Sequence, residues 1–240
     1  MGKTFITGDT HGSRDFHKLN SKHWPEGAKL TKEDVVIICG DWGAIFWPPT
    51  STWAKSDLWL RKWYESKPWT TVVVPGNHEN YDEIFKLPEI EMFGGMVRQV
   101  SDSVVILKRG KIYTINGKTF WTMGGGLSID KSSRIVGQSW WAQEHPSYIE
   151  LNEGMDILNE RKGDIDYVIT HVAPQDALSN IIGICYQRDP KYYDPLSEYL
   201  QTVTDSYLGD YTQWFCGHYH IDHDVTDKKL KVLYDRIIQI

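Results

Sequence analysis

Five short runs of apolar, largely β-branched residues, each followed at once by a polar cluster, constrain this chain more than any other feature. In the run VVVPGNHEN, three valines enter a Pro-Gly turn, and Asn77, His78 and Glu79 then follow side by side. Continuous apolar runs of this kind are typical of strands in a sheet that is covered on both faces. The other four runs are KTFIT, DVVIIC, DYVIT and YTQWFC, which end at Gly8-Asp9-Thr10-His11, Gly40-Asp41, His171 and Gly217-His218-Tyr219-His220.

Three segments between these runs have the apolar spacing of amphipathic helices. The first has Ser51 or Thr52 as its expected N-cap, and the second has Ser147 as its cap and Gly163 at its end. Strand–helix alternation therefore dominates both ends of the chain, which predicts an α/β protein. The expected helices are residues 51–67, 146–163 and 194–209.

The middle of the chain has a different pattern. Residues 103–107, 111–115 and 118–123 are expected to be strands, with a turn at Arg109-Gly110 after the first and at Asn116-Gly117 after the second. Asn-Gly between apolar runs is a strong hairpin signal. We expect an antiparallel meander here, so the sheets should mix parallel and antiparallel strands.

Composition limits the class of protein. The 240 residues, 40% hydrophobic and 24% charged, predict one domain over residues 1–240. A net charge of −6 disfavours binding to long nucleic acids. The longest apolar run, VVIIC, is too short to span a membrane, and the residues before the first predicted strand lead us to expect no secretory signal. Because Cys39, Cys185 and Cys216 do not form a disulfide pattern, a cytoplasmic location is expected.

The polar clusters predict a metal centre. One residue separates Asp9 from His11, and one separates His218 from His220, so each pair points the same way from an extended chain. Ligand sites form beyond the carboxyl ends of parallel strands, where all five clusters would meet. The candidate metal ligands are Asp9, His11, Asp41, Asn77, His171, His218 and His220.

This donor set exceeds the four ligands of a tetrahedral zinc ion and fits two metal ions. Asp41 is the expected bridge, because a carboxylate can bind one ion with each oxygen. Imidazoles and carboxylates without cysteine favour two divalent ions, Mn first, with Fe or Zn as alternatives. Two ions about 4 Å apart hold a phosphate ester for in-line attack by water.

The ordered motifs resemble those of the calcineurin-like metallophosphoesterase superfamily. The resemblance implies an α/β fold in which a two-sheet mixed β-sandwich is flanked by helices. It also implies a di-metal phosphoesterase that hydrolyses phosphate mono- or diesters by a metal-bound hydroxide. The matching motifs are Asp9-x-His11, Gly40-Asp41, Gly76-Asn77-His78-Glu79, His171 and Gly217-His218-x-His220.

The same resemblance implies a role for each matched residue. Asp41 is the shared ligand, and His78 corresponds to the family histidine that binds substrate phosphate or protonates the leaving oxygen. Asn77 and His78 would therefore contact the substrate. The implied ligands are Asp9, His11, Asp41 and His220 for one metal, and Asp41, Asn77, His171 and His218 for the other.

The segment MGGGLSIDKSSRIVGQSWWAQEHPS resembles a loop in a bacterial and phage subset of these enzymes. Two hypotheses remain open for Arg134. It enters the cleft as a catalytic and substrate-binding residue that grips a phosphate oxygen, or it lies on the surface paired with Asp130. The residues that carry the resemblance are Ser128, Asp130, Arg134, Trp140, Trp141 and Glu144.

Two alternatives to a general phosphoesterase follow from the resemblance. The Ser/Thr protein phosphatase branch carries Asp-Arg-Gly shortly after its Gly-Asp motif, whereas this chain has GDWGAIFWPP, which disfavours that branch. A non-catalytic scaffold on the same fold would lack metal ligands, and this chain has the full set. The choice between monoesters and diesters, the orienting partner of His78 and the oligomeric state stay open.

Several other residues are expected to be structural. Glu79 should open the helix after its motif, where a carboxylate favours the helix dipole. Cys39 and Cys216 should be small buried residues. His17, His23, His145 and His223 are expected to be surface or packing residues, with support of a metal ligand as the alternative for His223. Core packing is expected for the tryptophans that follow Asp41, and the alternative is that they stack on a base or form one wall of the cleft. These tryptophans are Trp42, Trp47 and Trp53.

Overall fold

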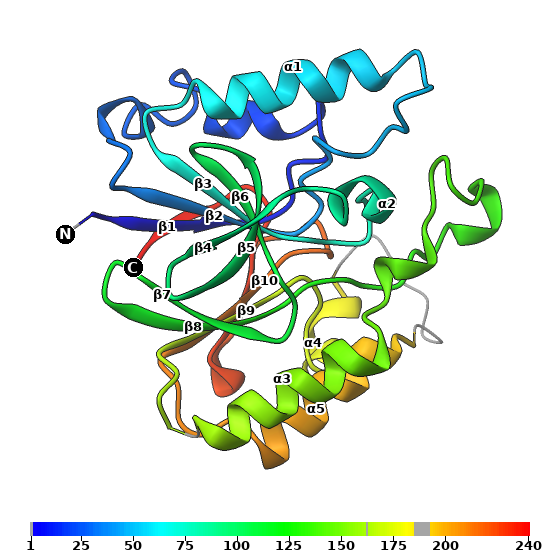
Figure 1. Ribbon diagram of the computed structural model, residues 1–240. Helices are drawn as coiled ribbons and strands as arrows, with labels where there is room; N and C mark the ends of the chain where they lie inside the picture. Colours follow the sequence, from blue (N-terminus) through cyan, green and yellow to red (C-terminus); the bar gives the residue numbers. More distant parts are fainter. Residues whose placement is uncertain (1, 162, 185–192) are drawn as a thin grey trace.

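Two β-sheets pack face to face between layers of helices in the computed structural model (Figure 1), which describes residues 2–161, 163–184 and 193–240. This is the mixed α/β sandwich that the sequence resemblance implied. Cys185, one of the three cysteines that are not expected to form a disulfide framework, lies outside the described residues. Across the described ranges, the helices include none with the length and apolar character needed to cross a membrane.

The first sheet has the strand order β13-β1-β2-β3-β6-β5-β4. Its centre is parallel, from β1 through β2 and β3 to β6, and antiparallel pairing adds strands at both edges. The strands are β1 Thr4–Thr7, β2 Val35–Cys39, β3 Thr70–Val74, β4 Glu89–Met92, β5 Gly95–Ser101, β6 Val104–Leu107 and β13 Ile237–Gln239.

The second sheet has the order β11-β12-β10-β9-β8-β7. Strands β8, β9, β10 and β12 are parallel, and β7 and β11 are antiparallel edges. The strands are β7 Lys111–Ile115, β8 Lys118–Met123, β9 Tyr167–Thr170, β10 Gln213–Cys216, β11 His223–Val225 and β12 Leu230–Val232.

The central strands are buried on both faces, as their continuous apolar sequences predicted. In β2, Ile37 points into the core between the sheets, whereas Val36 and Ile38 point into the core beneath α1. Helices α3 and α5 cover the outer face of the second sheet (Figure 1). The α-helices are α1 Ala54–Glu65, α2 Tyr81–Ile84, α3 Tyr148–Glu160, α4 Leu178–Ile182 and α5 Pro195–Ser206.

One of the two strand pairings of the predicted meander was confirmed, and the other was wrong. Strands β7 and β8 form the hairpin that Asn116-Gly117 indicated, but β6 pairs with β3 and β5 in the other sheet. The chain therefore crosses between the sheets at the Arg109-Gly110 turn. All residues of β6 are buried, because the strand has a neighbour on each side and a core on each face. Strands β4, β5 and β11–β13 were not predicted.

The predicted helix ends were partly correct. Ser147 caps α3 in a capping box with Glu150, although the helix ends at Glu160, before Gly163. The predicted cap of α1 was wrong, because its N-cap is Trp53 and makes no side-chain cap hydrogen bond. Ser51 instead accepts a hydrogen bond from the Trp53 backbone N at 3.2 Å, in the turn before the helix.

Candidate metal centre

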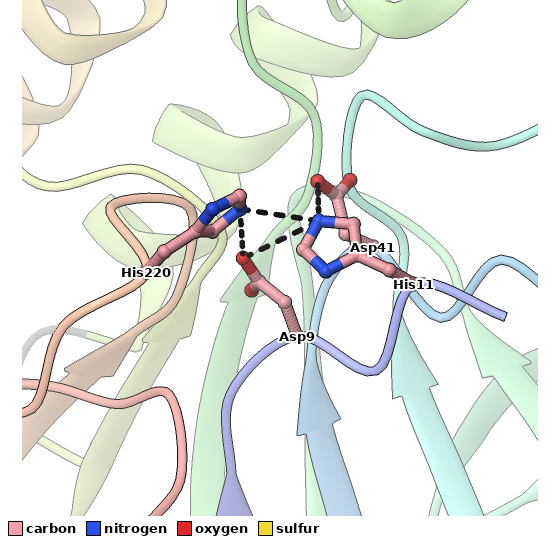
Figure 2. A group of neighbouring side chains, drawn as sticks. All are labelled: Asp9, His11, Asp41 and His220. Carbon is pink, nitrogen blue, oxygen red and sulfur yellow. Dashed lines mark hydrogen bonds and ion pairs between the residues drawn. The ribbon is translucent and has the colours of Figure 1, made fainter. Parts of the chain in front are cut away.

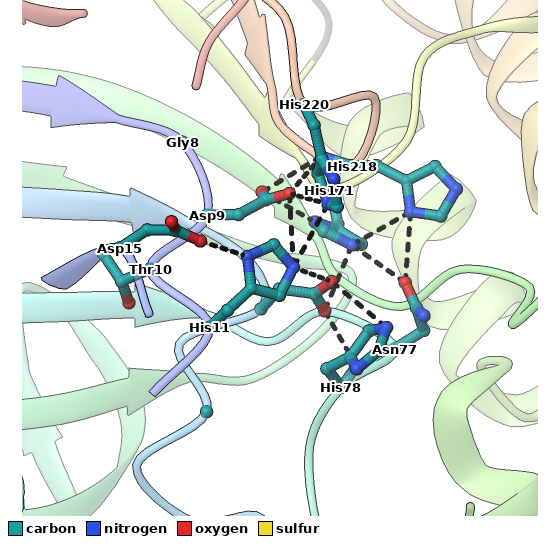
Figure 3. A network of polar contacts seen from close by, with 12 residues as sticks. Gly8, Asp9, Thr10, His11, Asp15, Asn77, His78, His171, His218 and His220 are labelled. Atoms are coloured by element: carbon teal, nitrogen blue, oxygen red, sulfur yellow. Dashed lines mark hydrogen bonds and ion pairs between the residues drawn. The ribbon is translucent and has the colours of Figure 1, made fainter. Parts of the chain in front are cut away.

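The carboxyl ends of β1, β2, β3, β9 and β10 meet at one end of the sandwich, and the loops that follow them bring the predicted ligands together (Figure 3). Parallel pairing within each sheet places these ends at the same edge. Every residue of the predicted ligand set lies in this cluster.

The first group of donors surrounds one point at the surface of the cleft (Figure 2). His11 Nε2 lies 3.3 Å from Asp41 Oδ2, and His220 Nε2 lies 3.4 Å from Asp9 Oδ2. The donor atoms of these four residues all lie within 4.8 Å of one another. They match the first ligand set that the resemblance implied.

The second group lies deeper and shares Asp41. His171 Nε2 is 3.3 Å from Asp41 Oδ1, the oxygen that does not face His11. Asn77 Oδ1 lies 3.0 Å from His171 Nε2 and 3.1 Å from His218 Nδ1. The two oxygens of Asp41 therefore face different groups, as a bridging carboxylate requires.

The donor set fits divalent metal ions. His11 Nε2 and His220 Nε2 are 3.1 Å apart, and His218 Nδ1 and His171 Nε2 are 3.2 Å apart. Two imidazole nitrogens at that distance repel unless a proton or a cation lies near both. Carboxylate, amide and imidazole donors without thiolate are suited to Mn, Fe or Zn.

The backbone of the site is strained. Left-handed φ angles are uncommon outside glycine and cluster at functional sites. The donors lie in turns directly after strands, so the prediction that each of the two motif pairs lies on an extended chain was wrong. His218 and His220 lie in different donor groups. The ligand candidates with such angles are His11 (φ 40°), Asp41 (46°), His218 (71°) and His220 (51°).

Two motif glycines allow the loops to approach each other. A Cβ on Gly40 would lie 2.0 Å from His171 Nδ1, and a Cβ on Gly76 would lie 2.2 Å from Asp41 Oδ1. No side chain fits at either position without moving a candidate ligand. The glycines therefore stand before Asp41 and Asn77 for a packing reason.

A model of the calcineurin-like phosphoesterase family matches residues 2–222 of this sequence. The chain belongs to the calcineurin-like phosphoesterase family. Family membership and the donor groups together indicate a binuclear site for divalent metals. A structure of the phosphopantetheinyl hydrolase PptH from Mycobacterium tuberculosis aligns with 100% of this chain and 95% of its own, at 15% identity and a TM-score of 0.48. A comparison with curated proteins gives no match.

Acidic side chains raise the pKa values of two histidines of this phosphoesterase. Burial alone lowers the pKa of His11, but hydrogen bonds to Asp15 and Asp41 outweigh it and raise this pKa to about 10. Burial is likewise outweighed at His171, where Asp41 and Asp9 raise the pKa to about 9. Burial raises the pKa of Asp41, yet His171 and His78 hold it well below its usual range.

Three residues that the motifs did not identify support the first donor group. Asp15 Oδ2 lies 2.9 Å from His11 Nδ1, which leaves Nε2 to face the centre. The buried ammonium of Lys18 donates to the backbone oxygens of Asp9, at 2.7 Å, and Tyr234. The Tyr234 ring stacks on His220, with centroids 5.1 Å apart.

Ser128 and Glu144 support Asn77 from the long loop at residues 124–147. Asn77 Nδ2 donates to Ser128 Oγ at 3.1 Å, and Ser128 Oγ donates to Glu144 Oε2 at 2.5 Å. All three side chains are buried. The chain of hydrogen bonds fixes the amide so that its oxygen faces His171 and His218. The sequence placed Ser128 and Glu144 in a loop motif but assigned them no role.

The structure places Arg134 in the cleft and not on the surface, although the predicted pairing with Asp130 is present. It pairs with Asp130 through Nε at 2.7 Å and also points into the cleft, where Nη2 donates to His78 Nε2 at 2.9 Å. Its side chain is only 9% exposed. Burial is the largest influence on His78 and lowers its pKa to about 4. A neutral imidazole can accept this hydrogen bond, whereas imidazolium cannot.

The prediction for Glu79 was wrong. Helix α2 is capped by Asn80, and the Glu79 carboxylate instead accepts hydrogen bonds from the backbone N of Trp42 at 2.7 Å and of Gly43 at 3.3 Å. Burial raises its pKa to about 8. Glu79 therefore anchors the loop after Asp41.

The residues expected to be structural have different environments. Core packing is confirmed for Trp42, which is fully buried, and was wrong for Trp53, which is exposed. Trp47 is half-buried and lines the cleft beside the metal centre. Cys39 and Cys216 are buried free thiols, as expected. None of the four remaining histidines belongs to either donor group among the described residues: His17, His23, His145 and His223.

Proposed function

We propose that this phosphoesterase hydrolyses phosphate esters at two divalent ions. The ligands are Asp9, His11, Asp41 and His220 for one ion, and Asp41, Asn77, His171 and His218 for the other. The observation that supports this most is the position of Asp41, whose two oxygens face two separate donor groups. When bound, the ions lower the pKa of water and neutralise the phosphate oxygens.

His78 is proposed to hold the substrate beside the metals. Its backbone N donates to Asp41 Oδ1 at 2.7 Å, which fixes the residue at the edge of the centre. Its lowered pKa supports a neutral imidazole that donates an N–H to a phosphate or leaving oxygen. Arg134 is proposed to bind a second phosphate oxygen, because its guanidinium reaches His78 and lines the cleft.

Hydrolysis of p-nitrophenyl phosphate and bis-p-nitrophenyl phosphate tests the proposal. The protein would be stripped with a chelator and reloaded with Mn, Fe or Zn in turn, with Asp41→Asn as the blank. We expect metal-dependent turnover that is highest with Mn. Faster monoester turnover would define a phosphatase, and faster diester turnover a phosphodiesterase. Metal binding without turnover of either ester would instead favour the scaffold, and absence of metal binding would contradict the ligand assignment.

A further inference from the structure

The metal cleft has a second compartment beside His78. A cavity of about 490 Å³ covers the metal centre, and another of about 420 Å³ adjoins it. The two cavities share four lining residues and therefore lie side by side: His11, Arg14, His78 and Asp130. We name the second cavity the aromatic compartment. The residues that line only this second cavity include Ser13, Phe46, Trp47, Asp57, Arg134 and Ser139.

Asp57 of α1 holds the segment that carries Phe46 and Trp47, the two aromatic residues of this compartment. The buried carboxylate of Asp57 accepts hydrogen bonds from the backbone N of Phe46 and of Trp47, each at 2.7 Å. The Phe46 ring also lies nearly parallel to the His78 ring, with centroids 6.1 Å apart and an interplanar angle of 27°. Two half-buried rings are thus held next to His78, the residue proposed to hold the substrate.

Positive charge lies where the two cavities meet. Arg14 lines both of them, and within the described ranges its guanidinium has no carboxylate at ion-pair distance. Arg134 contributes a second guanidinium, which Asp130 partly neutralises. A phosphate over the metals would therefore be bound at the entrance to the aromatic compartment, and its ester group would extend inward.

We propose that the aromatic compartment binds the nucleoside of a nucleotide substrate. A planar base fits against Phe46 and Trp47, because aromatic side chains stack on any base. The hydroxyls of Ser13 and Ser139 and the carboxylate of Asp57 suit the polar edges of a base and a ribose better than they suit a hydrocarbon group. The volume lies within the range of sites for small ligands.

The inference rests on the proposed phosphoesterase function and specifies its substrate class. In the reaction, the oxygen of water bonds to phosphorus as the P–O bond to the nucleoside breaks. One proton of the water passes to the departing 5′ oxygen, which leaves as the alcohol. The nucleoside then remains in the aromatic compartment until it dissociates.

Adenosine 5′-monophosphate and ribose 5-phosphate test this directly, because they share the same 5-phosphate ester and differ at C1 of the ribose, where one carries adenine and the other a hydroxyl. With the Mn-loaded enzyme we expect kcat/KM to be at least about tenfold higher for the nucleotide, the size of a typical base-stacking contribution. Trp47→Leu should reduce that ratio about tenfold and should keep the backbone N–H that Asp57 binds. The matched control is Trp59→Leu, which removes an indole that is 54% exposed and lines neither cavity.

Adenosine provides a second measurement that needs no variant. Adenosine has no phosphate and should bind in the aromatic compartment only. It should inhibit hydrolysis of ribose 5-phosphate competitively, because the ribose of that substrate would occupy the same compartment. Equal kcat/KM for the two esters, an unchanged ratio in Trp47→Leu, or no inhibition by adenosine would overturn the inference but leave the esterase function intact. If neither ester nor the nitrophenyl substrates are hydrolysed, the proposed function fails and the inference fails with it.

Discussion

The floor of the cleft and its wall are built in different ways. The floor consists of loops that follow buried parallel strands, and Asp9, Asp41, His171 and His218 are at most 4% exposed. The wall is the loop at residues 124–147, where the Asp130 side chain is 51% exposed. Two sheets fix the floor, whereas a few side-chain hydrogen bonds fix the wall. Changes in the floor should therefore abolish activity, and changes in the wall should alter substrate binding.

The largest effect is expected at the centre of the floor. Asp41→Asn removes the shared negative charge, so both ions should bind more weakly and turnover should fall about 1,000-fold or more. Metal content after dialysis and kcat on p-nitrophenyl phosphate measure this. Asp210→Asn, at a side chain that is 93% exposed, is the matched control. Full metal content with normal turnover in Asp41→Asn would show that the floor is not the metal site.

The next largest effect is expected from a substitution that disturbs the contact between wall and floor. Glu144→Gln disturbs the hydrogen bonds that orient Asn77 through Ser128, so affinity for the second metal should fall about 10–100-fold. Calorimetric titration of the metal-free protein would resolve the two sites. Asp15→Asn, beside His11, is the counterpart and should weaken the first site instead. If either variant lost the same metal affinity at both sites, the two donor groups could not be assigned to separate metal ions.

A smaller effect is expected in the wall alone. Arg134→Ala should raise KM about tenfold, because a charge-assisted hydrogen bond to phosphate is lost while the ions remain bound. Steady-state kinetics with Asp130→Asn as the comparison would separate the two roles of Arg134. If Arg134→Ala leaves KM and kcat unchanged, the residue is only the surface partner of Asp130.

The smallest effect is the number of protons that the floor releases when it binds metal. Without metal, His11 and His171 are protonated at neutral pH, because their pKa values are raised to about 10 and about 9. Metal ligation requires neutral imidazoles, so loading at pH 7.5 should release about two protons per chain. Calorimetry in buffers of different ionisation enthalpy measures the release. Release of no protons would contradict these protonation states.

The same shifts predict how the metal-free protein responds to pH. A raised histidine pKa stabilises the fold fully below the unfolded value of 6.5, and this contribution is lost as the pH rises through 9 and 10. Thermal melting from pH 6.5 to 10 should therefore show falling stability without metal. The metal-loaded protein should lack this loss, because its imidazoles stay neutral throughout the range.

Local sequence determined the strands of the floor and the donors at their ends. Apolar runs such as Val35–Cys39 predict buried strands by composition alone, and each donor follows its strand directly. Each donor lies within a few residues of the end of its strand, so a predicted strand end also gives the position of the donor. The seven candidate ligands can therefore be identified from the amino-acid sequence alone.

Contacts between distant segments were decided only by the tertiary structure. β6 resembles a hairpin strand locally, but it pairs between β3 and β5 in the first sheet, where both of its faces are buried. Glu79 looks like a helix opener, yet its carboxylate binds the loop after Asp41, 37 residues away. Asn77, Ser128 and Glu144 meet across the cleft for the same reason. Strands and the donors at their ends can be predicted locally, because they depend on residues that are neighbours in the chain. The long-range contacts of β6, Glu79 and Asn77 depend instead on how the two sheets pack.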